Sequence, residues 1–192
     1  MAMLAEVAGQ PRKFTRAEYN ALGRAGILRE DEHVELIFGV IVEMSPIDRR
    51  HVLSSKRVYD TLMIALRERA DVFQGAPFAA SDESEPEPDT FVAPLGSPDR
   101  DHPSHANLVV EVSRTSLAFD RVTKARLYAH ANVDEYWIVD LIRGRVEVRR
   151  DPITADGLWG TMTTHLGGER IAPRAFPDVE IVIDEILGPS DD

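Results

Sequence analysis

The alternation of apolar and polar residues predicts a helix followed by a hairpin in the first part of the chain. Thr15 with Glu18 three residues later has the form of a capping box, so a helix is expected to begin there and to end by Gly23 or Gly26. The run VELIFGVIVEM, residues 34–44, then places two apolar, β-branched-rich segments around a Phe-Gly pair. This pattern is typical of a β-hairpin.

Residues 45–70 carry the longest helical pattern in the chain. Apolar residues recur near the 3.6-residue period, while arginines and a lysine fall on the other side. We therefore expect one face of this helix to pack against a sheet. The apolar face consists of Leu53, Val58, Leu62, Met63 and Leu66.

The second half of the chain reads mainly as strands. LVVEVS, residues 108–113, is almost continuously apolar and predicts a strand covered on both faces. A helical pattern at 119–131 and a further buried strand, EYWIVDL, at 135–141 follow it, and this order predicts a crossover with parallel pairing of the two strands. Further strands are predicted at 71–78 and 89–94, an edge strand at 145–150, and a last strand with a closing segment from Gly157 onward.

Length and composition favour one domain. A chain of 192 residues with 43% hydrophobic content suits a single sizeable core, here assigned to residues 12–188 with flexible tails at 1–11 and 189–192. The absence of cysteine excludes disulfides and thiolate metal sites. No signal-peptide core and no long apolar run is present, so we expect a cytoplasmic protein with no membrane partner.

The overall charge is acidic, with 22 basic and 33 acidic side chains and a net charge of -11. That sign disfavours tight non-specific binding to a polyanion. It leaves room for a local basic patch, or for a divalent cation held among carboxylates.

Two acids occupy positions where chemistry is expected. Asp89 follows the proline-spaced acidic stretch SEPEPD and opens a strand, and Glu111 interrupts an otherwise apolar strand. Neighbouring strands of a small sheet can bring two such carboxylates together to share one Mg²⁺ or Mn²⁺. Such an ion suits phosphodiester hydrolysis, because it activates water and stabilises charge on the phosphate.

Three segments carry a resemblance to a known family, in this order: PEPDTFV, LVVEVS and FDRVTKARLYAHANVDEYWIVD. Through them the chain resembles the Uma-type restriction endonucleases of the PD-(D/E)xK nuclease superfamily. VELIFGVIVEMSP resembles the acidic hairpin of that family, and the likeness runs from about Phe14 to Leu187. It implies an α/β (α+β) fold with a restriction-endonuclease-like core, in which a mixed sheet is flanked by helices. It also implies that Asp89 and Glu111 are the ligands of Mg²⁺ (or Mn²⁺) and that Glu35 is an added acid.

The sequence departs from the superfamily pattern at one position. The pattern has a lysine two residues after the glutamate, where this chain has Ser113. Lys124, on the helix that follows, is the natural replacement, because a helix packed back on the sheet can send a long side chain to the same cleft.

Each acid also has an ordinary structural interpretation. Asp89 is compatible with a turn or strand start, and Glu111 with a core acid satisfied by an arginine or by backbone groups. Glu35 fits a solvent-facing hairpin position as well as it fits a metal site. Lys124 has the spacing for a helix-surface ion pair with Asp120.

Polar residues near these acids are expected to be solvated. His102 and His105 lie in a turn-rich stretch without a third ligand, which favours solvated side chains over a metal site. The segment before Asp89 is expected to be a solvent-exposed loop that its prolines make stiffer. Its acidic residues are Glu83, Glu85 and Glu87.

Three functions are compatible with these features. The leading one is a Mg²⁺-dependent endonuclease that hydrolyses DNA, uses no small-molecule cofactor and acts as a homodimer, since cutting both strands needs two sites. The second is a catalytically degenerate nuclease fold that binds nucleic acid or a protein. The third is a structural or regulatory oligomer whose acids are buried ion pairs.

Overall fold

A computed structural model describes residues 11–29, 31–46, 48–97 and 101–189. The tails predicted at 1–11 and 189–192 fall almost entirely outside these ranges. None of the helices in the described ranges combines the length and the hydropathy that a bilayer crossing requires.

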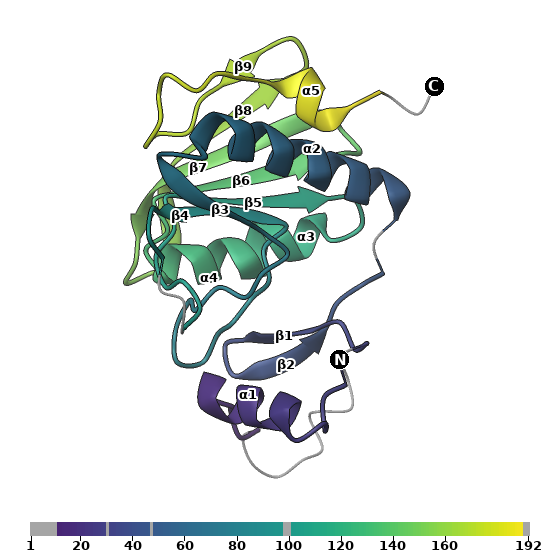
Figure 1. The fold of residues 1–192 in the computed structure, drawn as a ribbon, viewed down its shortest axis with the longest axis vertical. Coiled ribbons are helices and arrows are strands. Elements are labelled where there is room, and N and C mark those ends of the chain that lie inside the picture. Colours follow the sequence, from purple (N-terminus) through teal and green to yellow (C-terminus); the bar gives the residue numbers. More distant parts are fainter. Residues whose placement is uncertain (1–10, 30, 47, 98–100, 190–192) are drawn as a thin grey trace.

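The first elements form a small unit of their own at one end of the molecule (Figure 1). Helix α1, Arg16–Arg24, begins with the predicted capping box between Thr15 and Glu18. Strands β1, Val34–Ile37, and β2, Val40–Glu43, pair antiparallel as the predicted hairpin. Its Phe-Gly turn has positive φ at both residues, as a two-residue type I′ turn requires.

A six-stranded mixed sheet forms the body of the molecule, in the order β3-β4-β5-β6-β7-β8. All neighbouring pairs are antiparallel except β5 and β6, which are parallel as predicted. The sheet with its flanking helices confirms the predicted fold class. The strands are β3 Ala70–Gln74, β4 Thr90–Pro94, β5 Leu108–Ser113, β6 Glu135–Asp140, β7 Arg145–Ile153 and β8 Leu158–Leu166.

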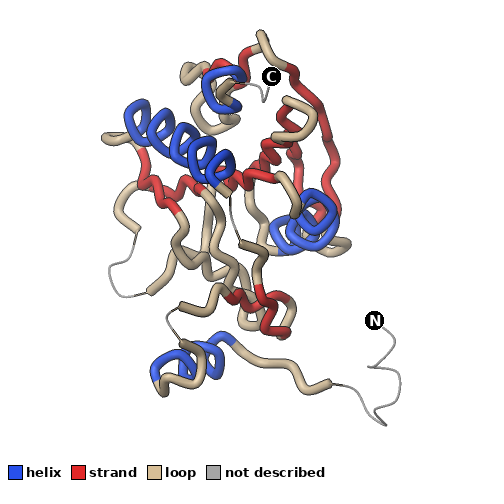
Figure 2. The backbone as a smooth tube through the Cα atoms, turned by 90° about the vertical axis from the view of Figure 1, so that its right-hand side faces the viewer, coloured by secondary structure: helices blue, strands red, loops and turns tan. Residues whose placement is uncertain are grey.

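Helices cover the sheet on both faces, as Figures 1 and 2 show from two directions. The predicted long helix is α2, Arg49–Leu66, and it packs on one face together with the short C-terminal helix α5, Ile183–Leu187. Of its predicted apolar face, Val58, Leu62 and Leu66 are buried, whereas Leu53 and Met63 are exposed. Strands β9, Arg170–Ile171, and β10, Ile181–Val182, pair with each other and lead into α5.

The opposite face is covered by one helical stretch that is not uniform. It begins as α3, Leu117–Phe119, continues as the π-helix η2, Asp120–Lys124, and ends as α4, Ala125–His130. Its buried side chains join an apolar cluster with strands of that face. A π-helical turn inside an α-helix shifts the register of the side chains that follow, and such turns are frequent at functional sites.

The prediction of an edge strand at 145–150 is wrong. Strand β7 lies inside the sheet, paired with both β6 and β8, and β8 is the edge. Val146 and Val148 point into the core, while Arg145, Glu147 and Arg149 lie on the other face. The alternation of polar and apolar residues shows that one face of the strand is polar. It does not indicate whether the backbone of the strand is hydrogen-bonded to a neighbour on one side or on both.

Candidate active site

The two predicted acids lie side by side at the edge of the sheet that is formed by strand ends, where β4 begins and β5 ends. Asp89 immediately precedes β4, which pairs antiparallel with β5 and its Glu111. The backbone amide of Asp89 donates to Glu111 Oε2 over 3.4 Å. The prediction that their strands are neighbours is confirmed, and Glu111 is buried, with 5% of its surface exposed.

Lys124 reaches the same place from the π-helix. Its Nζ lies 2.9 Å from Glu111 Oε1 and 2.8 Å from Glu35 Oε2, and the side chain is 2% exposed. A surface ion pair with Asp120, the alternative suggested by spacing, is therefore wrong. Asp120 instead accepts hydrogen bonds from the Ser113 and Ser116 hydroxyls, each 2.6 Å long. Ser113, which stands at the position of the superfamily lysine, thus anchors the turn of the helix that carries Lys124.

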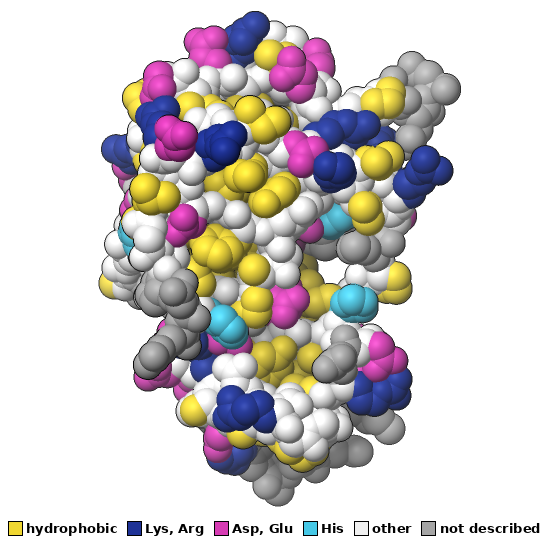
Figure 3. Space-filling model, viewed as in Figure 1, with side chains coloured by type: hydrophobic (Ala, Val, Ile, Leu, Met, Phe, Trp, Pro, Cys, Tyr) yellow, Lys and Arg dark blue, Asp and Glu magenta, His cyan; other side chains and the backbone are white. Residues whose placement is uncertain are grey.

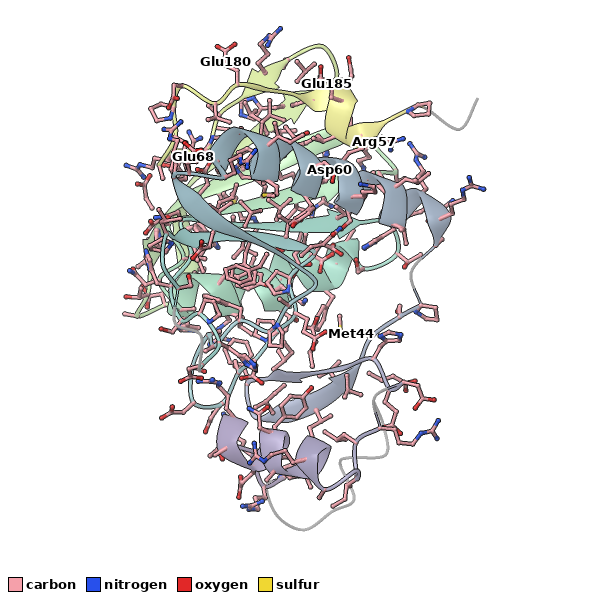
Figure 4. The ribbon with its side chains drawn as sticks, viewed as in Figure 1. Met44, Arg57, Asp60, Glu68, Glu180 and Glu185 are labelled. Atoms are coloured by element: carbon pink, nitrogen blue, oxygen red, sulfur yellow. The ribbon has the colours of Figure 1, made fainter. Side chains whose placement is uncertain are left out.

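Glu35 belongs to the hairpin, yet it is only 4% exposed. The solvent-facing interpretation of Glu35 is wrong, because its carboxylate contacts Lys124 through both oxygens. Through this contact the hairpin brings a residue that is distant in sequence to the lysine. Met44, directly after the hairpin, is labelled in Figure 4, and Figure 3 shows a hollow between this end of the molecule and its body.

Tyr128 is a member of this cluster that sequence reasoning missed. Its hydroxyl donates to Glu111 Oε1 over 2.6 Å, and the side chain is fully buried. Glu111 Oε1 therefore accepts from both Lys124 and Tyr128, whereas among the described residues Oε2 has only the long contact with the Asp89 amide. Tyr128 follows Lys124 by one helical turn, and this spacing was the available signal.

His51 was also missed. Its Nε2 lies 2.7 Å from Asp89 Oδ1, while Asp89 Oδ2 accepts the Val112 amide over 2.7 Å. Asp48, the N-cap of α2, accepts the amide of His51 and fixes the first turn of that helix. No sequence pattern ties the start of α2 to Asp89, because the contact depends on how the helix crosses the sheet.

The electrostatics of the cluster leave one carboxylate under-compensated. Burial raises the pKa of Glu111 well above its ordinary value, against the opposing effect of Lys124. Burial alone would lower the pKa of Lys124, but the charges of Glu111 and Glu35 outweigh it and the pKa is raised. Lys124 is therefore a protonated amine between two buried acids, and the pKa of Glu111, raised to about 8, biases that carboxyl toward its neutral form.

Burial by itself would lower the pKa of His51. The hydrogen bond to Asp89 and the charge of Asp89 have the opposite and larger effect, so the pKa of His51 is raised. The imidazole is thus biased toward its charged form beside Asp89. The surroundings of Asp89 Oδ1 therefore favour a positively charged imidazole at this position.

The acidic stretch before Asp89 is only partly solvated. Glu85 is 2% exposed and pairs with Arg16 at 2.7 Å and with His102 at 3.0 Å, so its predicted solvation is wrong. This cluster ties α1 to the loop and is separate from the acids above. His105 instead lies 3.7 Å from Asp134. The two histidines thus have different acidic partners.

A metal ion would have to share its coordination with groups from outside the chain. Among the described residues, no three histidine, cysteine or acidic side chains are arranged to hold an ion. Asp89 and Glu111 offer hard carboxylate oxygens, and the poorly satisfied Oε2 of a carboxyl with a raised pKa is an oxygen that a cation would stabilise. Mg²⁺ commonly binds through one or two carboxylates and completes its shell with water and substrate phosphate, so the residues fit such an ion.

Comparison with known proteins identifies the family and the fold. The model of the Uma2 family, described as "Putative restriction endonuclease", matches residues 16–184. The crystal structure of a "putative nuclease belonging to DUF820" from Anabaena variabilis ATCC 29413 superposes with a TM-score of 0.69 at 15% sequence identity, covering 91% of this chain and 97% of that one. The search of curated proteins returned no match.

Proposed function

The chain belongs to the Uma2 family, and from that premise we propose that it is a divalent-metal-dependent endonuclease that hydrolyses DNA phosphodiester bonds. One observation carries the proposal: Glu111 in β5 accepts the backbone amide of Asp89, which directly precedes β4, and the Nζ of Lys124 from η2. Burying two acids and a lysine together costs folding free energy, which favours a role that uses these ionisable groups.

Asp89 and Glu111 are proposed to hold Mg²⁺ or Mn²⁺, with Glu111 using Oε2 because Oε1 is occupied by Lys124 and Tyr128. When bound, the ion would activate water and stabilise charge on the phosphate. The Val112 amide holds Asp89 Oδ2 and so fixes the orientation of that carboxylate. The other oxygen, Oδ1, lies 2.7 Å from His51 Nε2.

Lys124 is proposed to supply the cation that Ser113 cannot. Its Nζ stays protonated between Glu111 and Glu35, so it can offset negative charge growing on the phosphate and orient the attacking water. Glu35 holds the amine in place from the hairpin. The π-helical turn sets the register that aims the lysine at the sheet.

Duplex cleavage by this site would require two copies. Each chain offers one such cluster, and a two-fold pair would present one cluster to each DNA strand. The homodimer is therefore part of the proposal.

The test is plasmid cleavage with Mg²⁺ or Mn²⁺ beside an EDTA control. We expect metal-dependent nicking or linearisation by the parent protein and none by Lys124→Ala, while Mn²⁺ affinity of that variant stays within about tenfold, or about 1.4 kcal/mol, of the parent. Lys56→Ala is the matched control, because Lys56 is exposed on α2 and pairs with Asp60. Cleavage by Lys124→Ala at the parent rate would refute the role of the lysine, and a parent protein inactive with both metals would refute the nuclease.

A further inference from the structure

Exposed arginines gather at the sheet edge where Asp89 and Glu111 lie. Arg114 directly follows β5, Arg143 lies in the turn after β6, and Arg49 begins α2. Because β5 and β6 are parallel, their carboxyl ends meet at the same edge, and the Leu141 amide donates to the Ser113 carbonyl there over 3.0 Å. All three arginine side chains are exposed.

A chain of contacts connects these arginines to the acids. Arg114 Nη1 donates to Asp48 Oδ2 over 2.5 Å, and Asp48 Oδ1 accepts the His51 amide. His51 in turn contacts Asp89. The start of α2 and the end of β5 are thus joined beside the candidate active site. In Figure 1 this is the edge at which the β5 arrow points toward the beginning of α2.

We propose that Arg49, Arg114 and Arg143 form the surface that receives the phosphate backbone of duplex DNA next to Asp89 and Glu111. The inference rests on the proposed function and names the residues that would position its substrate. Adjacent strands lie about 4.8 Å apart, so Arg114 and Arg143, which follow neighbouring strands, can contact nearby phosphates of one DNA backbone. Arginine is also the side chain best suited to phosphate oxygens.

The acids at this edge do not cancel the surface. The Arg114–Asp48 pair is open to solvent, with 39% of each side chain exposed, and exposed pairs of this kind contribute little to stability. A phosphate can therefore replace Asp48 as one partner of Arg114. Asp140 is buried and shared among Arg121, Arg143 and Arg145, so one carboxylate faces three guanidinium groups.

The net charge of -11 makes this placement informative. A uniformly acidic surface would repel DNA, whereas a local basic edge orients it toward the acids. The exposed arginines at this edge are therefore the local basic charge that the net charge of the chain conceals.

The test measures binding separately from cleavage. A short fluorescein-labelled duplex is titrated in EDTA, where the proposed hydrolysis cannot occur, at salt concentrations between about 50 and about 200 mM. Replacing all three arginines with alanine should remove three phosphate contacts and reduce the slope of log Kobs against log salt by about 2.7. The matched control removes the same charge elsewhere through exposed Arg24, Arg67 and Arg170, and it should keep the parent slope.

A triple arginine-to-lysine variant sharpens the result, because lysine keeps the charge and should keep most of the slope. Equal slopes and affinities for the alanine variant and the control would overturn the proposal, as would a parent protein with no measurable binding. The same variants are then assayed for cleavage with Mn²⁺. Normal cleavage by the alanine variant refutes the arginine surface and leaves the nuclease standing. Arginine-dependent binding without any cleavage refutes the nuclease and leaves the surface standing.

Discussion

Two buried glutamates on neighbouring parallel strands have very different surroundings. Glu135, at the start of β6, is fully buried and satisfied on both oxygens. Oε1 accepts the Trp137 indole N–H at 2.7 Å and Arg150 Nε at 2.9 Å, and Oε2 accepts the Arg174 amide at 2.6 Å. Within the part of the chain that the structure describes, Glu111, in β5, has its strong contacts on Oε1 alone.

The difference separates a structural acid from a candidate functional one. The donors of Glu135 include a backbone amide and an indole, which keep the carboxylate in one place and leave it little capacity for a ligand. Glu111 keeps Oε2 directed toward Asp89 with a single long contact, and burial raises its pKa. Burial of an acid alone therefore does not indicate function, and the informative feature is an acceptor left without a strong donor.

The largest expected effect comes from exchanging each glutamate for glutamine. Glu111→Gln should reduce metal-dependent cleavage by at least about 10³-fold while the protein stays folded, because the shape is kept and a metal ligand is lost. Glu135→Gln should leave cleavage unchanged and lower the free energy of unfolding by about 1.5–3 kcal/mol, since it weakens charged hydrogen bonds. Plasmid assays and urea unfolding measure the two quantities. Unfolding of Glu111→Gln would instead identify Glu111 as a structural ion-pair member.

The next effect concerns the cations beside the two acids. Lys124→Met should lower the free energy of unfolding by about 3–5 kcal/mol, because it leaves Glu111 and Glu35 buried without their cation. Arg150 is 34% exposed, so Arg150→Met should cost about 1 kcal/mol or less through its ion pair. Adding Glu35→Gln to Lys124→Met should restore part of the stability and none of the cleavage. Equal losses for the two single variants would contradict the comparison.

Metal binding gives a third, smaller effect. Mg²⁺ or Mn²⁺ at about 100 times its Kd should stabilise the parent protein by about 2.7 kcal/mol, seen as a rise in Tm. Asp89→Ala should abolish this rise, whereas Glu135→Gln should keep it. Titration calorimetry that detects no heat with the parent protein at millimolar Mn²⁺ would count against the site.

The smallest effect distinguishes two buried tyrosines. Tyr128 donates to Glu111, whereas Tyr136 donates to the backbone carbonyl of Asp120 over 3.2 Å. Tyr128→Phe should weaken Mn²⁺ binding and slow cleavage by about tenfold, because Glu111 loses the donor that orients it. Tyr136→Phe should cost about 1 kcal/mol of stability and leave the Mn²⁺ affinity unchanged. Identical Mn²⁺ affinities in both variants would show that Tyr128 does not position Glu111.

Much of the fold could be predicted because local patterns express it. The capping box of α1, the Phe-Gly hairpin turn and the period of α2 each depend on residues close together in sequence. The parallel pairing of β5 with β6 followed from the order of strand, helix and strand. The position of β7 did not follow, because polarity along a strand does not reveal which strands flank it.

The sequence by itself determined which residue types were available and the approximate positions of the main strands and helices. It also pointed to Asp89 and Glu111, and to Lys124 as the proposed replacement for the lysine expected at Ser113. Tertiary structure alone decided that Lys124 lies between Glu111 and Glu35 and that His51 contacts Asp89. These contacts join segments far apart in the chain, and their geometry depends on how helices cross a sheet and on a π-helical turn. Periodicity fixes the face on which a side chain lies, whereas packing between elements fixes what it meets.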